Sequence, residues 1–203
     1  MSLQFDDATH TYRLDGRVIP SVTQILKQVV DFSMVPPDVL ERKCALGSAL
    51  HMAIALDHEG DLDEDSVDAA VRPYLDGWRK FVADMGSALV IHAAEVPIAS
   101  KRYGYGVTPD IWGRIGADQA VIELKSSAVI HPATALQTAA QAEALIELGH
   151  LSKSYRVALR RFCVQLKPTG GYAVKEFNSA GDFGVFLALR SVWGWRAANK
   201  LGV

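Results

Sequence analysis

A change of pattern near residue 88 constrains the fold of this chain more than any other feature. Beyond it, three successive segments have the apolar, alternating character of β-strands, with the turn signal Gly116-Ala117-Asp118 between the last two. Helices, then a cluster of strands, then a mixed tail predict an α/β fold with a central mixed sheet flanked by helices. The expected elements are strands 89–99, 105–115 and 120–126, helix 132–148, strands 155–166 and 172–177, and helix 183–200.

The first 88 residues predict an N-terminal β-hairpin followed by helices. Asp15-Gly16 is a hairpin turn signal, and Ser21 is suited to cap a helix at its N-terminus. At 203 residues the chain is expected to form a single domain, with a hairpin and helical region 1–88 and a core 89–203. The expected elements here are strands 11–14 and 17–19, helix 21–30, helix 38–58, and a helix after 61–65 that ends near 85.

Charge and cysteine content exclude several classes of protein. The formal net charge of −2 disfavours a passive nucleic-acid-binding module, which is usually basic, but an enzyme with acidic metal ligands need not be basic. Cys44 and Cys163 are far apart and form no CxxC pair, which argues against a zinc site, an iron–sulfur cluster or a disulfide scaffold. Their apolar neighbours predict that both cysteines lie in the core.

The sequence shows no signal for membrane insertion or export. The first ten residues include Asp6, Asp7 and His10 and lack an apolar run of useful length. No segment reaches the roughly 18 apolar residues that a membrane span requires. We therefore expect a soluble, cytoplasmic protein, in a bacterial cell or a phage-infected host, with no membrane partner.

Two carboxylates and a lysine stand out in the strand-like region. On the apolar strand 120–126, alternation places Glu123 and Lys125 on one face, where burial without partners is costly. Asp110 precedes Glu123 by twelve intervening residues and lies on what reads as the adjacent strand. Carboxylates bind a hard divalent cation, and a lysine can stabilise charge on a phosphate, so the set suits metal-dependent phosphodiester hydrolysis. Glu-x-Lys alone is also common on exposed sheet faces.

Polar residues on two expected helices add to this set. On helix 38–58, His51 shares a face with apolar residues and points inward, and Gly47 one turn earlier would allow close backbone approach. Gln137 and Gln141 lie one turn apart on the helix that follows the Glu123 strand. Each has an ordinary alternative, because His51 could be a core histidine and the glutamines could be helix-surface residues.

Taken in order, these pieces resemble a known family. The chain is similar to RecB-like members of the PD-(D/E)xK nuclease superfamily, in particular the phage-type exonucleases, whose fold has a restriction-endonuclease-like core. No single piece is specific, but five in the same order are. The pieces are His10-Thr11-Tyr12 through Pro20-Ser21-Val22-Thr23-Gln24-Ile25-Leu26, Gly47-x-x-x-His51, Glu95 with Gly106-Val107-Thr108-Pro109-Asp110, Ile122-Glu123-Leu124-Lys125-Ser126-Ser127, and Leu136-Gln137.

The resemblance implies a metal site for Mg²⁺ or Mn²⁺. Asp110 and Glu123 would be its acidic ligands, as oxygen donors suit a hard cation. The carbonyl oxygen of Leu124 and the imidazole of His51 would complete the site, and Glu95 is a further carboxylate on the metal side.

The resemblance also implies catalytic roles for residues beside the metal. Lys125 would orient the attacking water or stabilise the pentacovalent phosphate, and Gln137 would position the site through Lys125 or the substrate. Many relatives have a tyrosine four residues after the glutamine and an arginine before the motif glycine, where this chain has Gln141 and Leu46. These departures concern DNA contacts more than hydrolysis.

DNA contacts are expected from a basic and aromatic segment. Lys101, Arg102, Tyr103 and Tyr105 combine positive charge with stacking surface just before the Asp110 motif. The alternative is a solvated hairpin tip with no part in binding.

The function expected from these observations is that of a metal-dependent DNA exonuclease in phage or prokaryotic DNA recombination or repair. Two alternatives remain open: a catalytically inactive, nuclease-derived DNA-binding module, and a structure- or site-specific endonuclease of the same fold. The partners implied by the resemblance are DNA, a single-strand annealing protein or a helicase, and further copies of the chain in a homo-oligomer.

Overall fold

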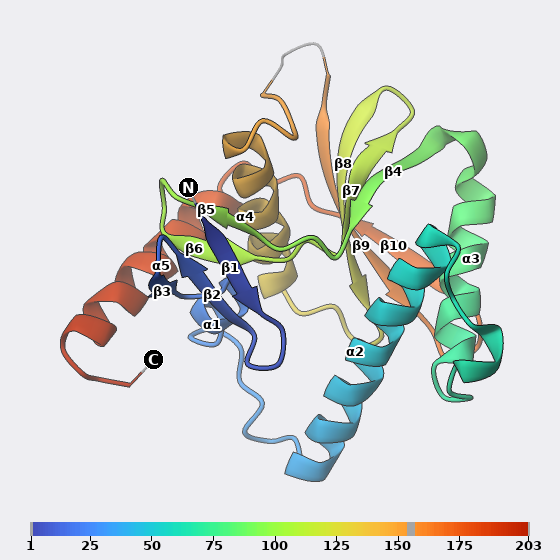
Figure 1. The fold of residues 1–203 in the computed structure, drawn as a ribbon, viewed down its shortest axis with the longest axis horizontal. Helices are drawn as coiled ribbons and strands as arrows, with labels where there is room; N and C mark the ends of the chain where they lie inside the picture. The colour runs from blue at the N-terminus through green and yellow to red at the C-terminus, as the bar shows by residue number, and fades with distance from the viewer. Residues whose placement is uncertain (1, 154–156, 203) are drawn as a thin grey trace.

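The structure is a computed structural model and describes residues 2–153 and 157–202. Its centre is a five-stranded mixed sheet, which confirms the predicted α/β class (Figure 1). The strand order is β10-β9-β8-β7-β4, with β8 and β9 parallel and the other neighbours antiparallel. The strands are β4 (Leu89–Ala94), β7 (Ile111–Ile115), β8 (Asp118–Lys125), β9 (Leu159–Leu166) and β10 (Tyr172–Glu176).

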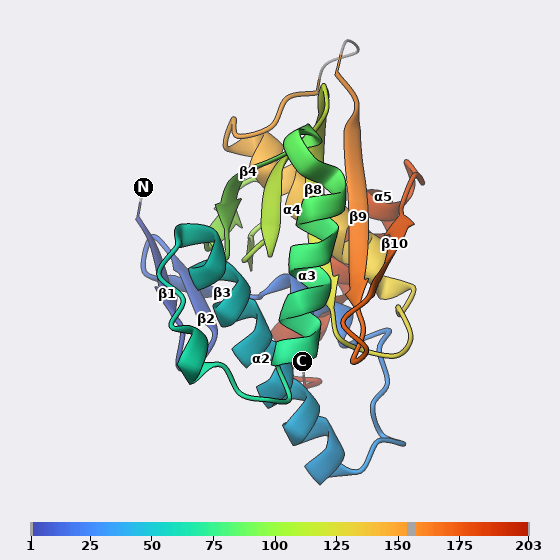
Figure 2. The same cartoon turned by 90° about the vertical axis from the view of Figure 1, so that its right-hand side faces the viewer.

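Helices cover both faces of this sheet, as Figures 1 and 2 show. On one face Ile122 and Leu124 pack into a core with α3 and α2, whereas Val121 packs on the other face with α4, α5 and α1. Glu123 and Lys125 therefore lie on the α4 face, as the strand alternation predicted. The helices are α1 (Val22–Leu26), α2 (Pro37–Glu59), α3 (Arg72–Met85), α4 (Ala133–Glu147) and α5 (Asp182–Ala198), with short 3₁₀ turns η1 (Glu64–Ser66) and η2 (Gly86–Ala88).

The parallel pairing of β8 and β9 determines where α4 lies. Parallel neighbours require a crossover connection, and α4 supplies it between the end of β8 and the start of β9. Contacts of α4 with both strands hold the helix across the sheet face that carries Glu123 and Lys125. Residues on the inner side of α4 are thereby brought next to those two charges.

The N-terminal region forms a separate three-stranded antiparallel sheet of β1 (Leu3–Asp6), β2 (Thr11–Leu14) and β3 (Arg17–Ile19). The two predicted strands are confirmed, and β1 is an additional one. The sheet docks on the β5–β6 hairpin, of Ile98–Ser100 and Tyr105–Val107, because the Gly106 N–H donates to the Pro20 carbonyl at 2.9 Å. A Cβ on Gly106 would lie 2.2 Å from Cγ of Tyr12, so only glycine allows this approach.

Two predicted strands are wrong as single elements. Segments 89–99 and 105–115 each divide into two strands that belong to different sheets, β4 and β5 in one case and β6 and β7 in the other. The register of Ile111 with Ile122 would place Pro109 opposite Leu124 if the ladder continued. Proline has no N–H to donate, so the β7–β8 ladder ends there and the chain turns away.

Several predicted helix and strand boundaries differ from the observed ones. The helix after Ser21 ends at Leu26, although the predicted cap is confirmed by a capping box with Gln24. The third helix begins at Arg72, with Pro73 in its first turn, rather than directly after 61–65. The predicted strand 155–166 begins at Leu159, and its first two predicted residues lie outside the described part of the chain.

The two cysteines lie in different environments. Cys163 is buried as expected, but Cys44 is exposed, because the buried residues of α2 all lie in its C-terminal half, at Leu50, Ala53 and Ile54. Among residues 2–153 and 157–202, no helix combines the length and apolar character needed to cross a membrane.

Candidate metal centre

A cleft of about 730 Å³ brings the predicted site residues together. It lies between α2, the N-terminal sheet, and the ends of β7 and β8, with the first turns of α4 behind it. Six of the predicted residues line it, and they come from five separate segments of the chain. These residues are His51, Glu95, Asp110, Glu123, Lys125 and Gln137.

Three of these side chains form a group that could hold a metal ion. Nδ1 of His51 lies 2.7 Å from Oε1 of Glu95 and 3.6 Å from Oδ1 of Asp110. Among the described residues, one donor atom from each of the three lies within 4.8 Å of the other two. The group joins α2, the segment after β4, and the segment before β7, which are distant in sequence.

The backbone fixes the position of Asp110. The Leu124 N–H donates to Asp110 Oδ2 at 2.6 Å, and the Asp110 carbonyl accepts from the Glu95 N–H at 3.0 Å. Glu95 adopts a left-handed φ of 52°, a strained conformation for a residue other than glycine, at the point where the chain leaves β4. Because the N–H and C=O of one strand residue point to the same edge, the Leu124 carbonyl also faces the Asp110 side.

Glu123 is held by two partners on the α4 face. Lys125 Nζ lies 2.5 Å from Glu123 Oε1, and Gln141 Nε2 donates to Glu123 Oε2 at 2.7 Å. Lys125 Nζ is also 3.4 Å from Gln137 Oε1. In this arrangement Glu123 lies beside the His51, Glu95 and Asp110 group, and its carboxylate is occupied by the lysine and the glutamine.

Gln141 has a role beside the site that its sequence pattern does not specify. Its side chain is fully buried, and its Oε1 has no hydrogen-bond partner. Its spacing of one turn from Gln137 groups the two glutamines with the site, with helix-surface polarity as the alternative, but does not predict the contact with Glu123. That spacing places both amides on the side of α4 that faces β8.

The concentration of charge shifts several pKa values in the cleft. Burial, and then the charges of Glu123 and Glu95, raise the pKa of Asp110 to about 8. Burial lowers the pKa of His51, but the charge of Asp110 and the hydrogen bond and charge of Glu95 outweigh it and raise the pKa to about 9. Burial also opposes the charge on Lys125, yet Glu123 and Asp110 hold its pKa above the usual range.

Gly47 lines the cleft, but its predicted role in close backbone approach is wrong. A Cβ at this position would meet no atom within 4 Å outside its own helix and chain neighbours. The helix here faces open cleft space rather than another backbone.

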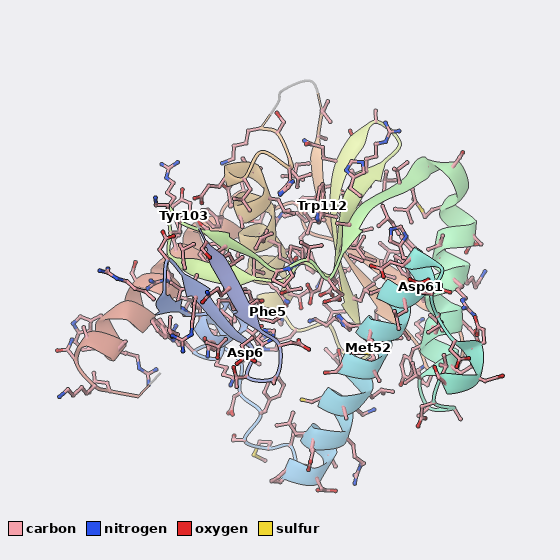
Figure 3. All side chains as sticks on the ribbon, in the orientation of Figure 1. Phe5, Asp6, Met52, Asp61, Tyr103 and Trp112 are labelled. Atoms are coloured by element: carbon pink, nitrogen blue, oxygen red, sulfur yellow. The ribbon has the colours of Figure 1, made fainter. Side chains whose placement is uncertain are left out.

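The expected DNA-contact segment lies away from the cleft. Lys101, Arg102 and Tyr103 are at the turn of the β5–β6 hairpin, and the Arg102 N–H donates to Glu147 near the end of α4. Figure 3 places Tyr103 well apart from Phe5 and Met52, which line the cleft. Tyr105 is fully buried and its hydroxyl donates to the Ala140 carbonyl, so this side chain is not available for DNA contact.

Comparison of the chain with protein-family models and with curated proteins finds no match in either case. What is established about the chain therefore comes from its own fold and site geometry. They establish a mixed α/β fold with a central mixed sheet, and a His51, Glu95 and Asp110 group that could hold a metal ion.

Proposed function

We propose that this protein is a metal-dependent DNA nuclease that hydrolyses phosphodiester bonds, acting as an exonuclease. The observation that carries the proposal is that a candidate metal-binding group and a half-buried lysine line the same open cleft. The exonuclease mode, and a role in phage or prokaryotic recombination or repair, rest on the order of the sequence motifs.

The donor set fits Mg²⁺ or Mn²⁺. Asp110 and Glu95 offer carboxylate oxygens and His51 an imidazole nitrogen, and we propose the Leu124 carbonyl as a further oxygen donor and Glu123 as the second motif carboxylate. Burial, and then the charges of Glu123 and Glu95, raise the pKa of Asp110, and a divalent cation would relieve the repulsion among these carboxylates. When bound, such a cation lowers the pKa of water and neutralises phosphate charge.

Lys125 is the residue we propose to act on the scissile phosphate. Its ammonium group lines the cleft, and the neighbouring carboxylates keep it charged at neutral pH. A fixed positive charge in a largely desolvated site stabilises charge that develops on phosphate oxygens more effectively than a solvated one. Gln137 would limit the positions that the ammonium group can take, through its contact with Lys125.

Digestion of end-labelled linear DNA, single- and double-stranded, tests the proposal. We expect the wild-type protein to release labelled products only with added Mg²⁺ or Mn²⁺, and Lys125→Ala or Glu123→Ala to reduce the rate by roughly a hundredfold or more. Lys80→Ala is the matched control, because Lys80 is exposed on α3 and pairs with Asp84. A protein that binds Mn²⁺ but cuts neither substrate would contradict the proposal.

Circular DNA and calorimetry distinguish an exonuclease from the two alternatives, an endonuclease and an inactive DNA-binding module. An exonuclease leaves end-free circles intact, whereas a site-specific endonuclease of the same fold linearises them. Isothermal titration with Mn²⁺ should show binding by the wild type that Asp110→Asn weakens. Absence of any Asp110-dependent Mn²⁺ binding would instead indicate a DNA-binding module that has lost catalysis.

A further inference from the structure

The same cleft carries a group of aromatic rings to which the proposed hydrolysis assigns no role. Phe5, His10 and Tyr12, here called the aromatic ledge, line the cleft together with the metal-binding group. The His10 ring stands edge-on to Phe5, with centroids 5.3 Å apart, and edge-on to Tyr12 at 5.5 Å. Tyr12 is buried, Phe5 is half-buried and His10 is exposed, so the ledge presents ring surface to the cleft from a firmly packed base.

The ledge is fixed relative to the metal-binding group. The Tyr12 hydroxyl lies 2.6 Å from the Thr108 hydroxyl, two residues before Asp110. The Tyr12 ring also packs directly on Gly106, and the Phe5 ring packs against the Tyr12 ring, with centroids 4.6 Å apart. A ligand on the ledge would therefore have a defined position relative to Asp110.

The opposite wall of the cleft, on α2, adds an exposed apolar side chain. On α2, Ser48, Met52 and Ala55 share a side with His51 at helical spacing, and all four line the cleft. Met52 is 63% exposed, so its thioether is accessible from the cleft. Figure 3 shows Phe5 on β1 and Met52 on α2 on either side of the space between these elements.

Charge indicates which part of a nucleotide this region suits. Of the cleft-lining residues, all within the described part of the chain, Lys125 is the single Lys or Arg. The ledge side instead carries Asp7, which is exposed and disfavours a phosphate there. Flat rings, a thioether and a lack of Lys and Arg suit the face of a nucleobase.

We propose that the aromatic ledge and Met52 bind an unpaired nucleobase next to the scissile phosphate, between Phe5 with His10 on one side and Met52 on the other. The inference rests on the proposed nuclease function and adds a substrate preference to it. A base held in a duplex keeps its faces stacked on neighbouring bases, so the preferred substrate presents a single-stranded nucleotide at the site.

Fluorescence of 2-aminopurine tests base binding independently of cleavage. Single-stranded oligonucleotides carry 2-aminopurine at one end or the other, and binding is measured with Ca²⁺ at neutral pH. We expect quenching on binding to the wild type, and roughly tenfold weaker affinity for a strand whose corresponding nucleotide is abasic. Whether the DNA is also cut with Mg²⁺ or Mn²⁺ bears only on the proposed function.

The variant pair is Phe5→Leu with His10→Asn. Leucine preserves apolar packing on Tyr12 without a flat face, and asparagine tolerates the left-handed φ of 48° at position 10. We expect this double variant to lose the quenching and the preference over the abasic strand. Trp195→Leu is the matched control, because Trp195 is an exposed aromatic residue on α5 outside the cleft lining. The inference would be overturned if the double variant and Trp195→Leu quenched the fluorescence equally. It would also be overturned if the wild type bound the abasic strand as tightly as the unmodified one.

Discussion

At the scale of single residues, the cleft concentrates negative charge at a cost to folding. Asp110 is almost fully buried, and both Glu123 and Glu95 lie close enough to disfavour its ionised form. Such crowding is unfavourable for a protein without metal and useful for one that binds a cation. The metal ion proposed to bind here would offset that cost.

This crowding predicts that the metal-free protein becomes less stable as pH rises. The pKa of Asp110 is raised to about 8 and that of His51 to about 9, so the folded state keeps protons that the unfolded chain has lost. As the pH rises from about 6.5 to 8, each of the two groups lowers the free energy of unfolding, by up to about 1.4 kcal/mol per pH unit. Urea unfolding in EDTA across this range measures the slope.

Asp110→Asn is the control for that prediction. The amide oxygen can still accept from the Leu124 N–H, while the carboxylate charge that raises the pKa of His51 is removed. We expect a flatter pH dependence and higher stability than wild type at pH 8 without metal, together with loss of stabilisation by Mn²⁺. A wild-type slope that stays flat or rises with pH would contradict the charge assignment.

Gln141 offers a second prediction at this scale. Its amide donates to Glu123 deep in the protein, so Gln141→Leu leaves a buried carboxylate oxygen without that partner. We expect a loss of about 1–3 kcal/mol in the free energy of unfolding, measured in urea. Gln137→Leu, on the same helix but half-buried, should change stability much less. Equal effects of the two substitutions would argue against a positioning role for Gln141.

At the scale of elements, the site depends on where strands stop. The chain leaves the main sheet at Glu95 and returns to it through 108–110, and these two junctions bring Glu95 and Asp110 together. The segments beyond the breaks form the β5–β6 hairpin, which supports the N-terminal sheet and hence the aromatic ledge. If the strand continued at either point, Glu95 or Asp110 would be paired within the main sheet instead of lying in the cleft.

Gly106→Ala should uncouple the N-terminal sheet from this hairpin. A methyl group there would overlap the Tyr12 ring, and the buried ring has little room to move. We expect a loss of about 1–3 kcal/mol in the free energy of unfolding, seen as a lower midpoint in urea. Gly184→Ala on α5 is the matched control: its Cβ meets nothing within 4 Å, and alanine favours a helix by about 0.5–1 kcal/mol. A neutral Gly106→Ala would show that the two sheets are not closely packed.

At the scale of the whole molecule, one buried arginine links the sheet to two helices. Arg161 on β9 donates to the Ala135 carbonyl in α4 and, through its other terminal nitrogen, to Asp182 at the start of α5, each at 2.8 Å. Its neighbour Arg160 pairs with Glu176 on β10 in a more exposed setting. The two consecutive arginines thus differ in how much of the fold depends on them.

This difference gives a matched prediction. Arg161→Ala should cost roughly 3 kcal/mol or more in the free energy of unfolding, because it leaves the mostly buried Asp182 carboxylate without its arginine partner. Arg160→Ala should cost less than about 1 kcal/mol, as expected for a partly exposed ion pair. Thermal or urea unfolding of the two variants side by side provides the measurement, and the reverse order would refute this assignment.

Local patterns predicted much of the fold. The two strands of the N-terminal hairpin, the cap at Ser21, the extent of α2 and the position of α4 agree with the structure, because turn residues and caps act within a few residues. The third helix and the two long strands were wrong where a local pattern continued through a break. The breaks in the two long strands depend on pairing with strands elsewhere in the chain, which a local periodicity does not detect. The late start of the third helix follows from Pro73, which a helix accommodates in its first turn.

The sequence by itself determined the alternation that places Glu123 and Lys125 on one face of β8, and the helical spacing that aligns Gln137 with Gln141. Only the tertiary structure decided that Glu95 and His51 meet Asp110, that Gln141 rather than solvent holds Glu123, and that Tyr105 is buried. The reason is physical: spacing along one element fixes which side chains share a face, whereas contact between elements depends on sheet order, strand ends and close packing, which many distant residues set together.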